Sequence, residues 1–186
     1  MTVCIKERTT QHHLGSGYGQ VQDEEDVVMG IFSDNPKNGP KHKGERLVAT
    51  SFRRKDLAHG NVSLARRTYM PLESFQKNVV EPRERTAGKF VGVVVANVKA
   101  LRDIYAYIRG VHPRKSIRGI CVLDKVEGGD FDAHAALEYS EDQGDLSDPQ
   151  KDQVRDIIAS DLANKFSPIQ DAGVVLLSGN PDYIRP

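Results

Sequence analysis

The sequence predicts an α+β fold: a single compact domain with a mixed, mostly antiparallel sheet, about three packed helices and a polar N-terminal arm. Three observations lead to this prediction. Strand-like and helix-like apolar segments follow one another in mixed order, and some strands are short and adjacent. A length of 186 residues fits one domain, and 38% hydrophobic residues supply a core. Residues 1–45 are mostly polar, whereas 46–186 carry most of the apolar segments.

The composition of residues 1–45 predicts a mobile arm, because it offers too little apolar surface to offset chain entropy. The arm includes an acidic cluster at residues 23–26. The exception is residues 27–32, a short apolar island with the sequence Val-Val-Met-Gly-Ile-Phe. The island is either a strand that docks on a partner or a part of the domain.

The first half of the domain is expected to hold two strands and a helix. Residues 47–52 and 62–64 have the β-branched content of strands. Pro71 suits the first turn of a helix, so a helix is expected over residues 72–79. It should end before Pro82, in a polar connecting loop.

Next comes the strongest strand signal, the nearly continuous apolar run 90–96, which suggests burial on both faces. Asn97 is placed to cap a helix over residues 98–108, where apolar residues recur at helical spacing. After a basic loop, residues 119–124 read as another strand.

The last elements are a strand over residues 132–139, a helix over 150–165 and a strand over 174–177. Alternation along the first of these puts His134 and Glu138 on one face. Ser147-Asp148-Pro149 is a good start for the long helix, which carries a regular apolar stripe.

The two cysteines, Cys4 and Cys121, lie in a polar leader and in an apolar run. Free thiols in a reducing compartment are a simpler interpretation than a disulfide between such different segments. The N-terminus lacks the apolar stretch of a signal peptide, and no apolar run is long enough to span a bilayer. These observations predict a cytoplasmic protein with no membrane association.

Basic residues follow several predicted strands, although 26 basic and 26 acidic side chains give a net charge of zero. A zero balance argues against a general nucleic-acid binder, but it leaves room for a local basic patch. If these residues converge, they would form an anion-binding face suited to phosphates. The alternative is a set of solvated charges balanced by nearby acids. The candidates are Arg53, Arg54, Arg66, Arg67, Arg114, Lys115 and Arg118.

His134 is the leading candidate for chemistry, because carboxylates precede it and Glu138 shares its face. A histidine near carboxylates serves as a general base or a metal ligand. The alternative is a structural histidine bonded within the sheet. Since no second histidine lies at ligand spacing on this segment, the sequence predicts no metal and no cofactor.

Three short motifs carry a family resemblance: Gly60-Asn61-Val62-Ser63-Leu64-Ala65-Arg66, Pro71-Leu72-Glu73-Ser74-Phe75 and Asp132-Ala133-His134-Ala135-Ala136-Leu137. Their order resembles a group of small bacterial proteins with a Gly-x-x-Ser-apolar-x-Arg segment, a Pro-Glu-type helix start and a Pro-Ala-His-Ala strand. This chain has Asp132 where that group has proline. The resemblance implies a bacterial origin and an accessory role, and it directs attention to Ser63, Arg66 and His134 as neighbours in one site.

We therefore expect a non-enzymatic accessory or regulatory protein whose partner is another protein, with nucleic acid as a further partner if a basic patch forms. The resemblance alone suggests bacterial regulation or antiviral defence as the setting. The alternative is an enzyme acting on a nucleotide or phosphorylated substrate. In that enzyme His134 is the base, Arg66 and Arg54 clamp the phosphate, and Ser63 positions the substrate. It requires Ser63, Arg66 and His134 to converge beside a concave pocket.

Overall fold

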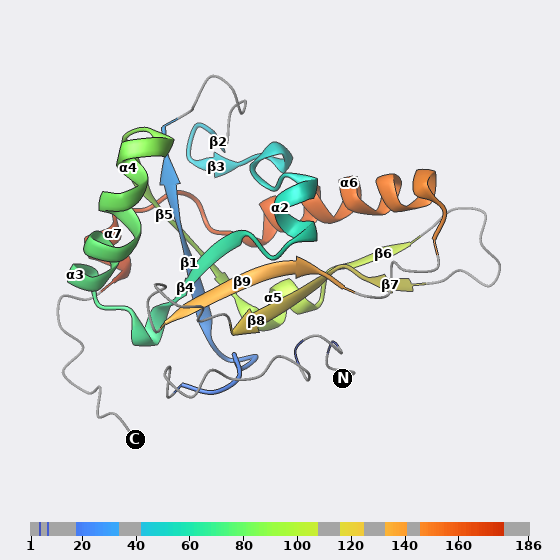
Figure 1. Ribbon diagram of the computed structural model, residues 1–186, viewed down its shortest axis with the longest axis horizontal. Coiled ribbons are helices and arrows are strands. Elements are labelled where there is room, and N and C mark those ends of the chain that lie inside the picture. The colour runs from blue at the N-terminus through green and yellow to red at the C-terminus, as the bar shows by residue number, and fades with distance from the viewer. Residues whose placement is uncertain are drawn as a thin grey trace.

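A five-stranded sheet lies at the centre of the protein (Figure 1). The computed structural model describes residues 4, 7, 18–33, 42–107, 116–124, 133–140 and 146–176. The strand order is β5-β1-β4-β9-β8, and every neighbouring pair is antiparallel. With helices packed on this sheet, the predicted α+β class is confirmed. The strands are β1 (Asp26–Phe32), β4 (Val62–Arg66), β5 (Phe90–Asn97), β8 (Ile120–Asp124) and β9 (His134–Tyr139).

The apolar island is an interior strand of the sheet. As β1 it lies between β4 and β5, with Val28 opposite Val95 and Val27 opposite Arg66. Its apolar side chains are buried on both faces. The boundary drawn at residue 46 is therefore wrong, because the domain includes β1. A seven-residue strand between polar flanks gives a weak compositional signal, and only its pairing on both edges identifies it as core.

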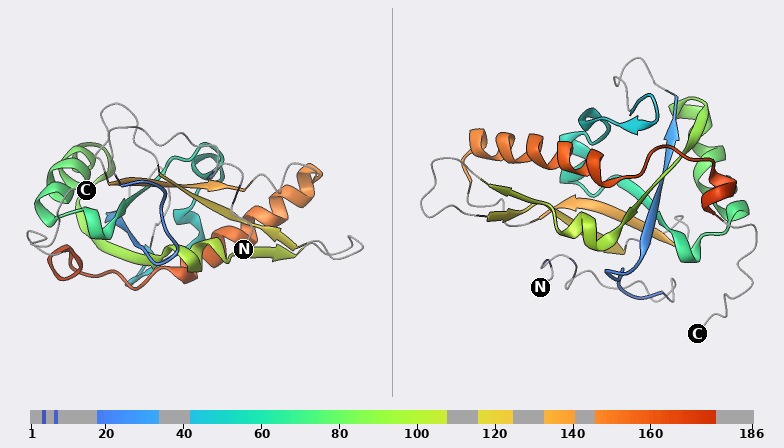
Figure 2. Two further views of the ribbon diagram at one scale, coloured as in Figure 1. Left: turned by 90° about the horizontal axis from the view of Figure 1, so that it is seen from below. Right: turned by 180° about the vertical axis from the view of Figure 1, so that it is seen from behind.

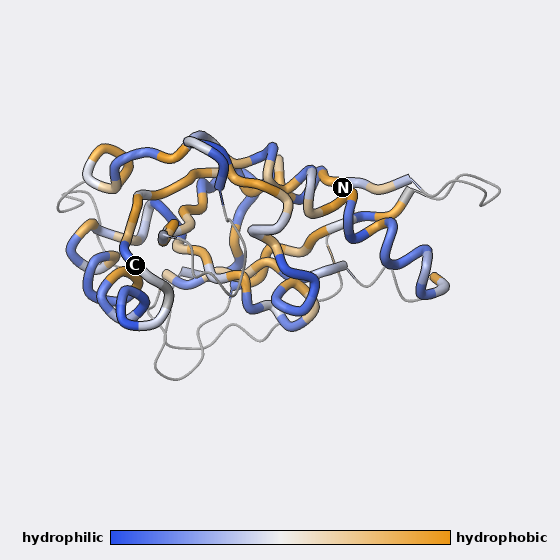
Figure 3. Tube along the Cα trace, turned by 90° about the horizontal axis from the view of Figure 1, so that it is seen from above, coloured by the Kyte–Doolittle hydropathy of each residue, from blue (hydrophilic) through white to orange (hydrophobic). Residues whose placement is uncertain are grey.

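One face of the sheet packs on the long helix α6 (Asp148–Lys165). Val154, Ile158 and Leu162 of α6 belong to one hydrophobic cluster with alternate side chains of all five strands. The helix α6 lies behind the sheet as seen in Figure 1, which the view from behind in Figure 2 shows. In Figure 3 the strands are mostly hydrophobic, whereas the outer turns of α6 are hydrophilic. Two short helices complete this layer, α2 (Arg54–Ala58) and α5 (Val98–Arg102). Within the described ranges no helix is both long and apolar enough to cross a membrane.

The opposite face is covered by two separate parts of the chain. Over β1 and β5 lie α3 (Leu72–Phe75), α4 (Glu81–Ala87) and α7 (Ala172–Val175), with the turn between α3 and α4. Over β8, Cys4 packs on Cys121 and Leu123.

The helix that begins after Pro71 does not end before Pro82. It passes through a π-helical turn at Gln76–Val80 into α4, where Pro82 occupies the first turn. Because proline has no amide to donate, the α-helical hydrogen-bond ladder is interrupted at Pro82, directly after the π-helical turn. The predicted polar loop is therefore the second half of one long helical segment.

The helix predicted over residues 98–108 is shorter than expected. Asn97 caps α5 as predicted, accepting a hydrogen bond from the Ala100 amide, but α5 ends at Arg102. The chain then forms β6 (Tyr105–Tyr107), which pairs with β7 (Ser116–Arg118). Ala106 is buried between two exposed tyrosines, which is the alternation of a strand. Over residues 98–108 as a whole the apolar residues recur at helical spacing, so this short alternation was not recognised.

Two further strand predictions are wrong. Residues 47–52 hold only the end of β3 (Arg46–Leu47), which pairs with β2 (His42–Lys43), and then a 3₁₀ turn at Ala49–Ser51. Residues 172–175 form the short helix α7, capped by Asp171, instead of the start of a strand at residue 174. Both segments are apolar and short, so local pattern does not separate strand from turn.

Gly119 lies between β7, which pairs with β6, and β8, which pairs with β9. Its amide donates to the carbonyl of Ile104, and its carbonyl accepts from the amide of Ser140. These bonds continue the registers of β6–β7 and β8–β9. A Cβ at this position would lie 2.8 Å from Cγ1 of Ile158 and 3.1 Å from Cγ2 of Ile104.

We expect Gly119→Ala to lower the free energy of unfolding by about 1–3 kcal/mol, because the added methyl group overpacks the contact with α6. Urea denaturation followed by circular dichroism measures this loss. Val174→Ala is the control, since Val174 is 73% exposed. Equal stability of the two variants would contradict the close approach of Gly119 to α6.

Candidate functional site

Two of the three residues expected to form one site lie in contact. Ser63 of β4 and His134 of β9 share a face of the sheet, because β4 pairs Ala65 with His134 in antiparallel register. Ser63 Oγ and His134 Nε2 lie 2.8 Å apart. His134 is buried and Ser63 is half-buried. A hydroxyl bonded to an imidazole suits a nucleophile and its base, and it equally suits a structural link between two strands.

Arg66, the third residue, points to the other face of β4, three positions from Ser63. Its side chain is completely buried. Nε and Nη2 donate to the two carboxylate oxygens of Glu25 at 2.8 and 2.6 Å, and Nη1 donates to the carbonyl of Gly19 at 2.7 Å. Asp124 of β8 adds an ion pair at 3.6 Å. The guanidinium therefore has no exposed surface with which to clamp a phosphate.

Two tyrosine rings complete the surroundings of Arg66. Tyr18 and Tyr69 stack with ring centroids 4.3 Å apart. The Arg66 guanidinium carbon lies 4.8 Å from the centroid of the Tyr69 ring, within the range of a cation–π contact. The cluster thus joins β4, the segment before β1 and the turn after β4 around one buried charge.

Most of the other basic candidates pair with nearby acids. Arg53 contacts Asp56, Arg67 contacts Asp26, and Arg54 contacts Asp152 and Asp156 of α6. The hydrogen bond to Asp156 raises the pKa of Arg54.

The same residues do not come together on one face. Arg54 lies against α6, whereas Arg66 lies beneath the segment before β1. Arg118 is buried with its guanidinium 4.0 Å from Glu7. Arg114 and Lys115 lie outside the described residues. Among the candidates that the structure describes, charge is matched locally and no shared anion site forms.

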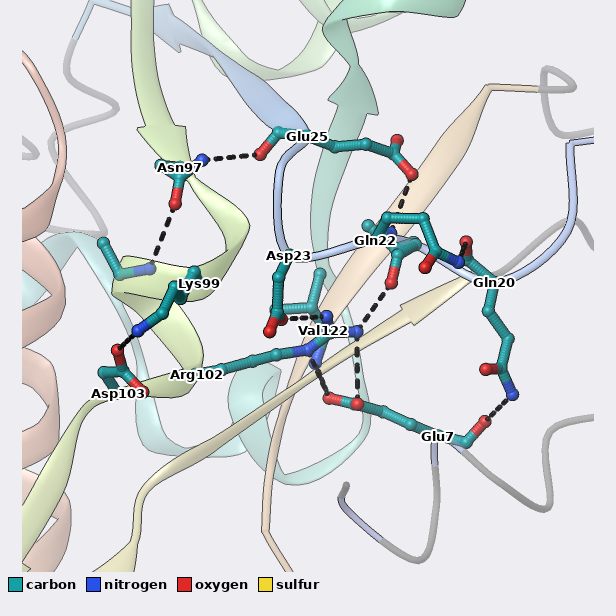
Figure 4. Close-up of polar contacts among 12 residues, drawn as sticks. Glu7, Gln20, Gln22, Asp23, Glu25, Asn97, Lys99, Arg102, Asp103 and Val122 are labelled. Carbon is teal, nitrogen blue, oxygen red and sulfur yellow. Dashed lines mark hydrogen bonds and ion pairs between the residues drawn. The ribbon is translucent and has the colours of Figure 1, made fainter. Parts of the chain in front are cut away.

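The acidic cluster predicted to lie in a mobile arm is held by arginines (Figure 4). Arg102 of α5 pairs with Asp23 at 2.6 Å and with Glu7 at 3.1 Å, and it donates to the carbonyl of Val21. Glu25 pairs with Arg66 as described above. Arg102, Glu7 and Glu25 are not among the residues predicted from the sequence. The available signal was the run of four acids at residues 23–26, whose partners are single arginines far along the chain.

Cys4 and Cys121 form a disulfide, with Cα atoms 5.9 Å apart. The expectation of free thiols is therefore wrong, because the fold brings the leader onto β8 and separation in sequence gives no indication of this. The two sulfur atoms and a Glu7 carboxylate oxygen lie within 4.8 Å of one another. Sulfur atoms bonded to each other are not thiolate ligands, so this group does not fit a metal ion in the oxidised state.

A cavity of about 270 Å³ lies at another place, between β1 and the turn after β4. Its lining does not include Ser63 or His134, so it does not supply the concave pocket that the enzyme hypothesis requires beside them. The lining residues are Glu24, Asp26, Arg67, Thr68, Met70, Pro71 and Val175.

Among the described residues, the most exposed aromatic side chains lie on β6. Tyr107 is 62% exposed and Tyr105 is 41% exposed, while Ala106 between them is buried. Ile104 accepts from Gly119 in the β6–β7 register, and antiparallel pairing alternates between bonded and non-bonded residues. The backbone groups of Tyr105 and Tyr107 therefore point away from β7. Sequence analysis assigned these tyrosines to a helix and did not identify them as a surface.

No protein-family profile matches this chain, and comparison with curated proteins and with solved structures finds no match.

We expect Arg66→Ala to lower the free energy of unfolding by about 3–5 kcal/mol, because it leaves buried carboxylates without their cation. Arg67→Ala is the matched control, because Arg67 is next in the chain and its side chain is 43% exposed. Loss of the surface ion pair between Arg67 and Asp26 should cost less than about 1 kcal/mol. Chemical denaturation measures both variants. Similar losses for both would contradict a special role for the buried pair.

Proposed function

We propose that this protein is a non-enzymatic binding protein that recognises another protein through β6. The observation that carries the proposal is the pair of exposed tyrosines, Tyr105 and Tyr107, on one face of an edge strand. This replaces the expected docking role of residues 27–32, which are used inside the sheet as β1.

Tyrosine is enriched in protein interfaces because its ring offers a large apolar area and its hydroxyl a hydrogen bond. The two rings share one face of β6, while Ala106 and its register partner Ile117 are buried on the opposite face. Nearby, Lys99 and Asp103 of α5 form an exposed ion pair, which adds charge to the border of this surface. An apolar centre with a charged border is the usual arrangement of a transient interface.

The geometry of β6 favours an extended segment of the partner. In the described part of the chain β6 pairs on one edge, with β7. The outward backbone groups of Tyr105 and Tyr107 match the donors and acceptors of an added strand, and the rings would contact alternate side chains of that strand. We define this surface, Tyr105 with Tyr107 and the outer edge of β6, as the β6 surface. A bacterial regulatory or defence setting remains a prediction from the resemblance.

We expect the variant Tyr105→Ala/Tyr107→Ala to lose a partner that the wild-type chain retains. Both proteins are immobilised and exposed to isotope-labelled host extract, and retained proteins are quantified by mass spectrometry. The candidate partner is then purified, and its dissociation constant is measured by calorimetry. Loss of two exposed tyrosines should weaken binding at least about tenfold, since interface tyrosines commonly contribute more than 1 kcal/mol each.

The control is Val174→Ala, which removes another exposed apolar side chain from α7, on a different part of the protein. It should keep full affinity. Hydrogen exchange in the purified complex should also slow at the outward amides of Tyr105 and Tyr107. A partner bound equally by all three proteins would refute the β6 surface, and binding that falls steeply with salt would indicate nucleic acid instead.

A second candidate function is catalysis by Ser63 and His134, favoured by the 2.8 Å contact between their side chains. If it holds, the chain hydrolyses p-nitrophenyl phosphate or p-nitrophenyl acetate, and His134→Ala lowers kcat/KM at least about a hundredfold. Arg67→Ala should leave the rate unchanged. Absence of hydrolysis in the wild-type chain, with His134→Ala altering stability alone, would assign the pair a structural role.

A further inference from the structure

The outer edge of β8 is covered by a side chain from the N-terminal segment. The β8–β9 register and the bond between Gly119 and Ser140 place the amide of Val122 on the edge away from β9. That amide donates to Oε1 of Glu7 at 2.8 Å. A carboxylate oxygen therefore takes the place that the carbonyl of a neighbouring strand would take.

Glu7 occupies a pocket that is suited to a carboxylate. Arg102 approaches both of its oxygens, with Nε 3.2 Å from Oε1 and Nη2 3.1 Å from Oε2. Arg118 of β7 lies 4.0 Å from Oε1, and Val122 contributes its amide. Glu7 is 5% exposed and the two arginines are largely buried, so the pocket is shielded from solvent. Figure 4 shows Glu7, Arg102 and Val122 meeting at this point.

A disulfide holds this segment in place. Cys4 lies three residues before Glu7 and is bonded to Cys121, which directly precedes Val122 in β8. Because the tether from Cys4 to Glu7 is only three residues long, the bond keeps Glu7 at a high effective concentration beside its pocket. Gln20 adds one hydrogen bond, to the carbonyl of Glu7.

We propose that Arg102, Arg118 and the Val122 amide form a carboxylate-binding site for an acidic, extended segment of a partner protein, and that Glu7 occupies this site while the Cys4–Cys121 bond is intact. This inference does not depend on the β6 surface. An incoming segment with a carboxylate would replace the contacts that Glu7 makes with Arg102 and with the Val122 amide. Its backbone would pair with the outer edge of β8.

Reduction opens the site. A dithiol reductant transfers two electrons to the disulfide, two protons complete the thiols of Cys4 and Cys121, and the reductant becomes a disulfide. Without the covalent bond the Glu7 segment must compete with a partner on the strength of its non-covalent contacts. Oxidation by a disulfide of a small thiol or of an oxidoreductase reverses the step and closes the site.

The first test compares the oxidised and reduced wild-type chain by amide hydrogen exchange. Alkylation without prior reduction, followed by mass spectrometry, verifies that the oxidised sample contains no free thiol. We expect the Val122 amide to exchange at least tenfold faster after reduction, and equally fast in Cys4→Ser, while amides of β1 keep their rates. Failure of the disulfide to form, or equal exchange of Val122 in both states, would overturn the proposal.

The second test uses a synthetic peptide of residues 2–10 with Cys4→Ser, and the same peptide with Glu7→Gln. The full-length chain with Cys4→Ser and Glu7→Ala should bind the glutamate peptide at least tenfold more tightly than the glutamine peptide. The oxidised wild-type chain should bind neither. Equal binding of the two peptides would exclude a carboxylate site. If the double variant does not fold, the exchange rates of the wild-type chain decide the question.

Discussion

The pair of Arg66 and Glu25 is the contact on which the N-terminal half of the structure depends. A guanidinium with no exposed surface must have its charge and all of its donors satisfied inside the protein, or the desolvation cost is not recovered. Glu25 supplies a two-oxygen partner, Gly19 a carbonyl and Asp124 a second carboxylate. These groups come from residues 18–25 and from β8, so the buried charge helps to hold residues 18–25 against the sheet.

Non-strand parts of the chain bond to the outer edges of both β5 and β8. On β5, Val93 exchanges two backbone hydrogen bonds with Gln170, and Val95 accepts one from Ser167. On β8, Glu7 receives the Val122 amide. Exposed edge strands invite pairing with other chains, and these covers limit it. The short strand β6 lies outside the five-stranded sheet, which leaves its tyrosines exposed to a partner and explains why we place recognition there.

The distribution of charge follows from the same arrangement. The run of acids at residues 23–26 meets arginines that lie on different elements: Asp23 meets Arg102, Glu25 meets Arg66 and Asp26 meets Arg67. Among the residues that the structure describes, these opposite charges are therefore matched as local pairs. This pairing disfavours the phosphate-clamp hypothesis for Arg66 and Arg54.

Local pattern by itself determined the α+β class, the strands at residues 62–64, 90–96 and 119–124, the Asn97 cap and the long helix after Ser147, because each depends on neighbours within a few residues. The contact between Ser63 and His134 was anticipated from a resemblance, but its geometry came from the β4–β9 register. Only the tertiary structure decided that residues 27–32 are core, that α5 gives way to β6, that Cys4 meets Cys121 and that Arg66 is buried. The physical reason is common to these cases: strand pairing, disulfide formation and burial of charge join residues that are distant in sequence, so no local window contains both partners.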